Sequence, residues 1–408
     1  CSSVLRWAAI TKTENRKKIM NNFEYSNPTR LVFGKGEESR IGELMRARVP
    51  AMSPVLVVYG GGSAKASGLL ERISESLKTA DLVPIELGGV TPNPQLSFVQ
   101  KGILLAREHR VKAILAVGGG SVIDASKAIA IGVPYVGDVW DFFTEKITPT
   151  EALPVAAVLT LPAAGSEQSI RIVISNGDRK LGAGSPLVRP FVSVIDPELF
   201  FTLPEKQIRA GVVDMMSHIM ERYFTQTKNT DFVDSQAESA MKTIMKNGLK
   251  LKKNPKDYDA WCQIGLAGSF AHNGYYGLGQ VEDWASHGME HELSAWDTTI
   301  THGEGLAVVV PAWMKYVWHA NPKRFVQFAR NVMGVKGEGT DEEIIRKGIK
   351  AFRRFLKKMG APKNLKELGA EKADLKELAK KAVEIPGKLG NFLPLYEKDI
   401  VKIYKLMR

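Results

Sequence analysis

The feature that most constrains the fold of this chain is a change in hydrophobic periodicity near residue 202. From residue 20 to residue 202, short apolar runs alternate with segments whose apolar residues recur at helical spacing. After Thr202-Leu203-Pro204, the helical period continues almost to the C-terminus. Alternating strands and helices are typical of a parallel sheet covered by helices on both faces. The sequence therefore predicts an α/β domain over residues 20–202 and an all-α domain over residues 203–408.

The expected strands and helices follow these two periods. The predicted strands of the first half are 55–59, 113–117, 153–161, 171–175 and 191–195. Segments 23–25 and 29–33 are short and flanked by polar residues, which is typical of edge strands or of an arm that reaches a second subunit. The predicted helices of the second half are 205–224, 231–246, 257–274, 281–296 and 305–318, with more beyond residue 341.

The net charge of +12 suggests a nucleic-acid-binding protein only until it is divided along the chain. Residues 1–19 carry a net +4, residues 321–408 carry +11, and the segment between them carries −3. The C-terminal lysines are interleaved with glutamates at helical spacing, and no stacking aromatic residues alternate with them. This pattern favours solvated helix faces over a nucleic-acid-binding surface, so we expect no nucleic-acid partner.

Two further observations narrow the class of protein. No run of eighteen apolar residues occurs, so the sequence predicts no membrane-spanning helix. Cys1 and Cys262 are the only cysteines, too few for a disulfide framework, and we expect a reducing compartment, the cytoplasm. Residues 1–19 contain no methionine and precede Met20, and we interpret them as an upstream extension without the apolar core of a signal peptide.

Two glycine triplets follow predicted strands of the first half. Gly118–Ser121 separates strand 113–117 from a helical segment, and Gly60–Ser63 follows strand 55–59. Neither matches the G-x-G-x-x-G pattern. Glycines at such a junction let the backbone approach a ligand, and a helix N-terminus attracts a pyrophosphate. We predict a Rossmann-like dinucleotide site here, with a merely structural tight turn as the alternative.

The first triplet would face the adenine-ribose end of the same cofactor. No acidic residue stands at the end of strand 55–59 to bind a ribose 2′-hydroxyl. A 2′-phosphate would therefore not be repelled there, which favours NADP(H), with NAD(H) as the alternative.

The strongest chemical signal is the distribution of histidines. Five of the seven lie within 85 residues of the helical half. Asp214 and His218 are four residues apart, as are His287 and His291, and His302 follows eleven residues later. Residues four apart leave the same face of a helix, and a carboxylate with imidazoles suits a first-row divalent metal. A lone helical histidine is usually structural, but this set predicts a metal site. Spacing alone leaves open which of His287 and His291 binds the ion.

Together, the two signals predict redox chemistry. A dinucleotide-binding domain joined to a helical metal-binding domain would place a nicotinamide and a Lewis acid across one cleft. The metal would polarise a carbonyl group, and the nicotinamide would exchange a hydride with its carbon.

At this point the chain from Phe23 onward resembles the iron-containing, or group III, alcohol dehydrogenases. Within this family it is most similar to the branch of butanol dehydrogenases and NADPH-dependent aldehyde reductases. The matching motifs are Asn27-Pro28-Thr29, Tyr59–Ser63, Pro92-Asn93-Pro94, Gly118–Asp124, Thr160–Glu167, Gly211–His218, Asp283–His287 and His291-Glu292-Leu293.

The resemblance implies a role for each matching position. It implies that Asp214, His218, His287 and His302 bind the metal, Fe²⁺ or alternatively Zn²⁺, and that His291 helps to move the proton. Gly61 replaces the aspartate of NAD-selective relatives, and Lys180 matches a lysine that assists binding of the cofactor. The expected cofactor-binding residues are Gly60, Gly61, Gly62, Ser63, Asn93, Gly119, Gly120, Ser121, Asp124, Thr160, Ser169, Lys180 and Leu199. The resemblance also implies a dehydroquinate-synthase-like architecture and a homodimer.

Three departures from the family pattern stand out. His287 and His302 are fifteen residues apart, one more than expected, so the loop 296–301 must bulge for His302 to reach the metal. Ala164 replaces a threonine, and Ser169 replaces an asparagine that contacts the cofactor in relatives.

The expected function is an NADP(H)-linked alcohol dehydrogenase that acts mainly as an aldehyde reductase. A dehydroquinate-synthase-like lyase and an NAD-linked polyol dehydrogenase of the same fold are the alternatives. A lyase acting on a phosphorylated, polyhydroxylated acid would need several basic residues in its cleft. The motif region instead offers aromatic residues, which suit small apolar or aromatic aldehydes: Phe142, Phe143, Tyr275, Tyr276 and Trp284.

Overall fold

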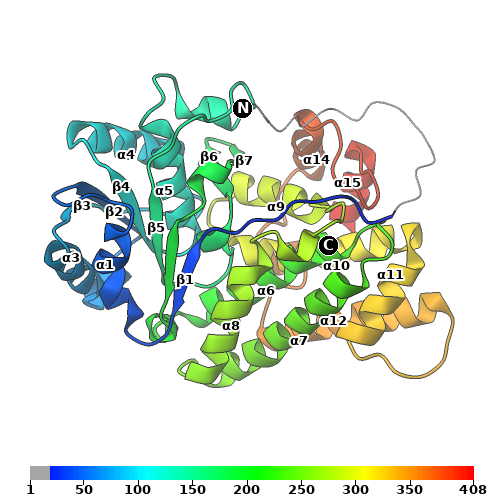
Figure 1. Ribbon diagram of the computed structural model, residues 1–408. Coiled ribbons are helices and arrows are strands. Elements are labelled where there is room, and N and C mark those ends of the chain that lie inside the picture. The colour runs from blue at the N-terminus through cyan, green and yellow to red at the C-terminus, as the bar shows by residue number, and fades with distance from the viewer. Residues whose placement is uncertain (1–18) are drawn as a thin grey trace.

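Aliphatic and β-branched runs of the first half form a six-stranded parallel sheet (Figure 1). The computed structural model describes residues 19–408, so Cys1 and almost all of the expected extension lie outside the described residues. The strands are β1 (Arg30–Phe33), β2 (Pro54–Tyr59), β3 (Val83–Leu87), β4 (Ala113–Gly118), β5 (Val155–Leu159) and β8 (Val192–Ile195). Their order is β1-β8-β5-β4-β2-β3, and every neighbouring pair is parallel.

Both faces of this sheet are buried, as its alternating side chains show. Leu56 and Val58 of β2 belong to a core shared with α4 (Leu96–Glu108) and α5 (Gly120–Gly132). Val55 and Val57 pack instead with α1 (Ile41–Arg46) and α3 (Leu69–Thr79). Because successive residues of a strand point to opposite faces, a strand that is apolar throughout needs helices on both sides. The predicted two-sided α/β architecture is confirmed.

The carboxyl ends of β2 and β4 place the two glycine triplets at one edge of the sheet. β2 and β4 are neighbours, and Tyr59 lies opposite Val117 at the ends of these strands. Thr160, just after β5, donates its backbone N–H to the carbonyl oxygen of Gly118 at 3.1 Å. The loops predicted to bind a dinucleotide therefore lie side by side.

Segment 171–175 was expected to be one of the alternating strands of the first half, but it does not join the parallel sheet. It forms an antiparallel hairpin of β6 (Arg171–Asn176) and β7 (Arg179–Gly184), with Gly177 at a φ of +59° in the turn. The Asn-Gly-Asp turn is a strong hairpin signal, but the run RKLGAG after it is too polar and too rich in glycine to stand out as a strand.

The hairpin reaches the helical half. Its turn is held against α14 (Leu375–Glu384) by ion pairs of Lys381 with Asp178 and of Arg179 with Glu384, at 2.5 and 2.6 Å.

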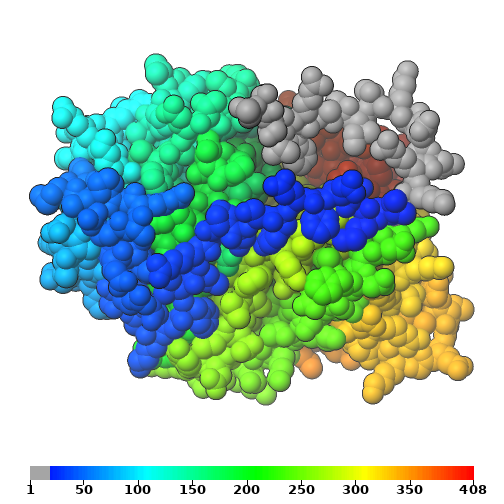
Figure 2. Space-filling view, in the orientation of Figure 1, coloured from blue at the N-terminus to red at the C-terminus, as the bar shows by residue number. Residues whose placement is uncertain are grey.

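Two other elements differ from the prediction. β3 was not expected because Pro84 interrupts its apolar pattern, but proline is tolerated on an edge strand and β3 is the last strand of the sheet. Of the two early segments, 30–33 is the edge strand β1, whereas 23–25 is not a strand. The chain before β1 crosses the helical half as an extended strap, and the backbone N–H of Asn21 donates to Gly279 (Figure 2).

From residue 205 onward, the structure is helical. The long helices are α6 (Glu205–Tyr223), α7 (Asp231–Lys253), α8 (Tyr258–Ala271), α9 (Ala285–Trp296), α10 (His302–Val317), α12 (Asp341–Met359), α14 and α15 (Glu397–Lys405). α9 begins four residues later than predicted because Trp284, at a φ of +66°, directly precedes it. Within residues 19–408, no helix is both long and apolar enough to cross a membrane.

The start of α10 packs unusually closely against α6. A Cβ atom at Gly303 would lie 2.0 Å from the backbone oxygen of Ala210 on α6. On the other side, a Cβ atom at Gly305 would lie 2.7 Å from Cγ of Glu290 on α9. The two glycines let the first turn of α10 fit between α6 and α9, which carry Asp214, His218 and His287.

Gly303→Ala should therefore lower the free energy of unfolding by about 1–3 kcal/mol, the usual cost of overpacking a core. Unfolding in urea would measure the change. Gly62→Ala is the matched control, because nothing lies within 4 Å of a Cβ atom there and its φ is −72°. Equal stabilities of the two variants would contradict the close crossing of α6 and α10.

Candidate metal and dinucleotide site

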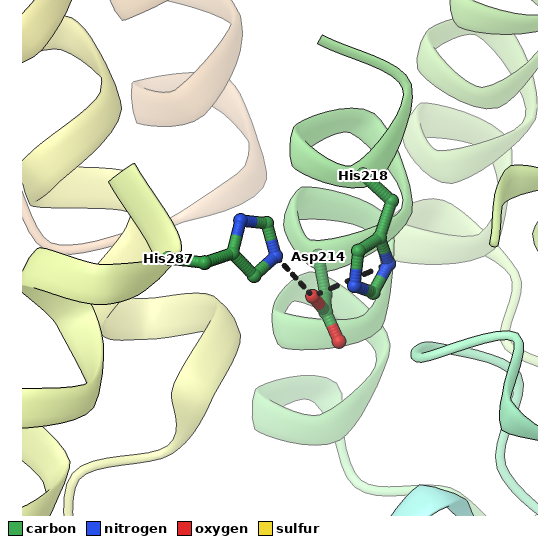
Figure 3. A group of neighbouring side chains, drawn as sticks. All are labelled: Asp214, His218 and His287. Carbon is green, nitrogen blue, oxygen red and sulfur yellow. Dashed lines mark ion pairs between the residues drawn. The ribbon is translucent and has the colours of Figure 1, made fainter. Parts of the chain in front are cut away.

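Asp214, His218 and His287 converge in the interior of the helical half (Figure 3). Asp214 and His218 leave the same face of α6, and His287 points at them from α9. Oδ1 of Asp214 lies 3.7 Å from Nδ1 of His218 and 3.9 Å from Nε2 of His287. A fourth group, Nε2 of His302 at the start of α10, lies 3.8 Å from the same oxygen.

The donor atoms of this cluster lack hydrogen-bond partners. Asp214 Oδ1, His218 Nδ1 and His287 Nε2 are all buried, and none has a hydrogen-bond partner among residues 19–408. Buried polar atoms are rarely left unpaired, because each costs its full desolvation penalty. An ion bonded to such atoms at about 2.0–2.2 Å can be shared by atoms up to about 4.4 Å apart, and the three separations from Oδ1 fall within that limit. The residues present therefore fit a divalent metal.

Burial sets the charge states of these groups. Desolvation raises the pKa of Asp214 to about 7, against a smaller opposing effect of His287. It also holds the pKa of His218 and of His302 well below the usual value, with nearby positive charge acting in the same direction. Neutral imidazoles are the form that binds metal ions, so the lowered pKa values of His218 and His302 favour binding of an ion.

The extra residue between His287 and His302 does not keep His302 from the cluster. α10 begins at His302 itself, and the loop 297–301 takes up the additional length. Asn93 of the α/β half donates its side-chain amide to the carbonyl oxygen of Thr298 in this loop at 3.1 Å.

The structure separates the two histidines that spacing could not. His287 lies beside Asp214, whereas His291, one turn further along α9, groups with Glu290 and His302. Its ring centroid lies 5.5 Å from that of His302. Burial holds the pKa of His291 well below its usual value, with the charge of Lys180 as the next contribution. His291 and Lys180 both line a cavity of about 160 Å³ between the hairpin and α14.

Two buried glutamates beside the histidines were missed at the level of sequence. Oε1 of Glu221 lies 2.9 Å from Nδ1 of His287, and Glu290 bonds to Nδ1 of His302. The signal was present, because each glutamate follows a histidine of the cluster by three residues, but a glutamate on a helix is too common to stand out.

Lys180 was expected to assist the cofactor, and the structure places it in the same buried region. Its ammonium group donates to Oγ of Ser294 at 2.8 Å and lies 3.4 Å from Glu290. It also lies 3.4 Å from Nδ1 of His302. Lys180 on β7 thus links the hairpin to the histidine cluster.

The glycine loop after β4 is closely packed. A Cβ atom at Gly119 would lie 3.0 Å from Leu161, and one at Gly120 would lie 2.8 Å from Ala164. Ser121 stands at the first turn of α5, which begins at Gly120. The loop therefore leads directly into the N-terminus of α5, a helix of thirteen residues. A glycine loop followed by a helix N-terminus is an arrangement that suits a pyrophosphate.

Asp124, expected at the cofactor, is engaged within the protein. Its two carboxylate oxygens accept from Oγ of Ser166 at 2.6 Å and from the backbone N–H of Val173 at 2.9 Å. The fully buried ammonium group of Lys127 donates to four oxygen atoms of residues 166–171, and burial lowers its pKa to about 8. Asp124 and Lys127 together anchor the loop after Gly165.

The remaining residues that were expected to bind the cofactor differ in their burial and in their contacts. Ser169 is buried, and its Oγ accepts from the backbone N–H of Arg171. Leu199 is partly buried and packs against the cores on both faces of the sheet. At the end of β2, Gly61 and Gly62 face open space.

A carboxylate near the end of β2 comes from Glu86, which the sequence did not predict. This residue stands on the neighbouring strand β3, and the hydroxyl group of Tyr59 donates to its Oε2 at 3.1 Å. The sequence gives no sign of the pairing of β2 with β3, so nothing in it connects Glu86 with the end of β2.

The expected aromatic lining is only partly present. Phe142 and Phe143 are buried in the core of the α/β half and do not belong to the cluster, which corrects the prediction. Trp284 does adjoin it, with ring centroids 5.0 Å from His287 and 6.0 Å from His218. Its backbone N–H donates to Oε2 of Glu221 at 2.8 Å, which stabilises its unusual positive φ.

Comparison with known proteins gives matches along most of the chain. Residues 28–197 match the family profile described as iron-containing alcohol dehydrogenase, and residues 208–407 match the C-terminal profile of the Fe-containing alcohol dehydrogenase family. The probable NADH-dependent butanol dehydrogenase 1 of Bacillus subtilis is 43% identical over 95% of this chain and 99% of that protein. The NADPH-dependent aldehyde reductase YqhD of Escherichia coli is 36% identical over 90% and 94%.

A solved structure agrees with these sequence matches. The crystal structure of NADH-dependent butanol dehydrogenase A from Thermotoga maritima superimposes with a TM-score of 0.91 at 41% identity. It covers 95% of this chain and 99% of that one. The family resemblance drawn from the sequence motifs is confirmed, and this chain belongs to the iron-containing alcohol dehydrogenase family.

Proposed function

We propose that this protein is a metal-dependent, NADP(H)-linked alcohol dehydrogenase that acts mainly as an aldehyde reductase on small aliphatic or aromatic aldehydes. Its family already makes it an oxidoreductase of alcohols and aldehydes. The observation that carries the proposal is the unpaired oxygen of Asp214, which faces nitrogen atoms of three histidines at 3.7–3.9 Å.

The metal would be held by Asp214, His218, His287 and His302. Mixed nitrogen and oxygen donors suit Fe²⁺ and Zn²⁺, and the family favours iron. The dinucleotide would lie along the glycine loops, with its pyrophosphate at the N-terminus of α5. When bound, the metal supplies Lewis-acid polarisation of a carbonyl group and the nicotinamide supplies the hydride.

His291 would move the proton. Its ring is neutral because burial lowers its pKa, and a neutral imidazole can accept a proton on one nitrogen while the other donates. It lies beside the cluster and lines the cavity next to it. These observations support a role for His291 in proton transfer rather than in binding the metal.

The alternatives differ in support. The family profiles that match this chain describe alcohol dehydrogenases, which favours a dehydrogenase over the lyase and nucleic-acid-binding hypotheses. An NAD-linked enzyme remains the second candidate, because relatives that are 43% and 42% identical carry the name NADH-dependent. We also propose a cytoplasmic homodimer, on the low cysteine content and on the family resemblance.

His218→Ala should abolish both bound metal and turnover, because it removes one of four ligands. Metal analysis of protein purified without oxygen and NADPH oxidation at 340 nm would measure these losses. Binding of NADPH should stay within a few-fold. The matched control is His109→Ala, an exposed histidine that follows α4. Stoichiometric metal and normal turnover in His218→Ala would defeat the four-ligand assignment.

His291→Ala should lower kcat by roughly 10²-fold, within the usual range for loss of general acid–base catalysis. Metal content should stay near that of the wild type, because His291 groups with Glu290 and His302 rather than with Asp214. Steady-state kinetics and metal analysis of one preparation would provide both numbers. Metal-free protein would instead identify His291 as a ligand.

The wild type should favour NADPH over NADH, and Gly61→Asp should reverse or erase that preference. A carboxylate at this strand end would bind a ribose 2′-hydroxyl and repel a 2′-phosphate. The site has room for it, since nothing lies within 4 Å of a Cβ atom at Gly61. The measurement is kcat/KM for both cofactors on one aldehyde. Gly61→Ala is the matched control, because it adds the methyl group without the charge.

A wild type that prefers NADH would refute this prediction. In that case the carboxylate of Glu86, beside Tyr59, would be the group to examine next.

A further inference from the structure

The histidine cluster contains a repeated His-x-x-Glu pattern. His218 and Glu221 stand on α6, and His287 and Glu290 stand on α9, in each case three residues apart. Residues three apart lie on the same side of a helix. In both helices the histidine faces Asp214, while the glutamate contacts the next of the expected metal-binding histidines: Glu221 contacts His287, and Glu290 contacts His302.

In the contact between Glu221 and His287, both carboxylate oxygens of Glu221 have hydrogen-bond partners. Oε1 lies 2.9 Å from Nδ1 of His287 and accepts from the backbone N–H of the same residue at 3.0 Å. Oε2 accepts from the backbone N–H of Trp284 at 2.8 Å. A carboxylate can only accept from this ring nitrogen, so the proton of a neutral His287 lies on Nδ1. The lone pair of Nε2 is then directed to the side where Asp214 lies.

The second contact joins Glu290 of α9 to His302 of α10 through one carboxylate oxygen, Oε2. Glu290 is fully buried and bonds to Nδ1 of His302, whose Nε2 lies 3.8 Å from Asp214 Oδ1. Lys180 lies 3.4 Å from the same carboxylate and holds Ser294 one turn further along α9. Gly305 leaves the space that Glu290 occupies, because a Cβ atom there would lie 2.7 Å from its Oε1.

We propose that Glu221 and Glu290 are positioning residues of the metal site: Glu221 orients His287, and Glu290 orients His302. The inference rests on the proposed metal site. Each carboxylate fixes the tautomer and the ring plane of its histidine and makes Nε2 a stronger donor. Lys180, at 3.4 Å from Oε2 of Glu290, pairs a positive charge with this buried side chain.

This role is distinct from a purely structural one. Glu238 is also buried and accepts hydrogen bonds, from Tyr223, Gln327 and Asn331, but it contacts no residue of the cluster. Loss of its charge should affect stability alone. Loss of the charge of Glu221 or Glu290 should in addition weaken metal binding, since the donor strength of a histidine depends on its hydrogen-bond partner.

The test compares Glu221→Gln and Glu290→Gln with the matched control Glu238→Gln in the full chain. Affinity for Zn²⁺ is measured by competition with a chromogenic chelator, and the geometry of the site by the visible spectrum of the Co²⁺-loaded protein. We expect both Gln variants to bind Zn²⁺ roughly 10–100-fold more weakly, the usual effect of losing such a partner. Their Co²⁺ spectra should shift, while Glu238→Gln matches the wild type in both measurements.

Wild-type Zn²⁺ affinity and an unchanged Co²⁺ spectrum in both Gln variants would overturn the inference. His218→Ala separates this result from failure of the metal site itself: if it too binds Zn²⁺ like the wild type, the proposed site is wrong. Should a Gln variant not fold, Glu221→Asp and Glu290→Asp carry the test. These variants keep the carboxylate but move it away from the histidine by one methylene group, so the affinity for Zn²⁺ should still fall. Wild-type affinity for Zn²⁺ in both Asp variants would refute the positioning role.

Discussion

The arrangement of the helical half depends on one buried oxygen atom, Oδ1 of Asp214. It has no hydrogen-bond partner, and three imidazole nitrogens surround it at 3.7–3.9 Å. Burying a carboxylate without a partner is costly, and the raised pKa of Asp214 reflects that cost. A cation bound between these atoms, as we propose, would compensate the cost of burying this carboxylate. The packing of α6, α9 and α10 brings the four groups of the proposed metal site around this one oxygen.

Charged groups also gather around this oxygen. The side chains of Asp214, Glu221 and Glu290 all lie at or beside the histidines of the cluster, and within residues 19–408 the ammonium group of Lys180 pairs with Glu290. Arg222, which follows Glu221 in α6, is buried as well. A divalent ion bound at the proposed metal site would reduce the mutual repulsion of these carboxylates in the low-dielectric interior.

Much of the fold and part of the candidate site could be predicted from the sequence. The remaining features of the site depend on contacts between residues far apart in the chain, which a sequence pattern does not record. The change of period at residue 202 indicated the two architectures, and the spacing of Asp214 and His218 indicated a metal site. Spacing could not choose between His287 and His291, because both leave the same face of α9. The choice came from the family resemblance, and in the structure only His287 lies beside Asp214. The roles of Glu221 and Glu290 depend on partners on other helices, and Phe142 and Phe143 carry no signal that distinguishes a core from a cleft.

The β6–β7 hairpin has a consequence for how such proteins can be divided or recombined. By sequence it belongs to the α/β half, but Lys180 bonds to Glu290 and Ser294, and its turn is paired with α14. A boundary drawn at residue 202 therefore cuts through one electrostatic unit. In a chimera of two relatives joined there, the hairpin of one parent would meet the carboxylate of the other. A recombined chain should therefore take the hairpin and the helical half from the same parent. The segment that has to be inherited together does not end at the boundary between the two architectures.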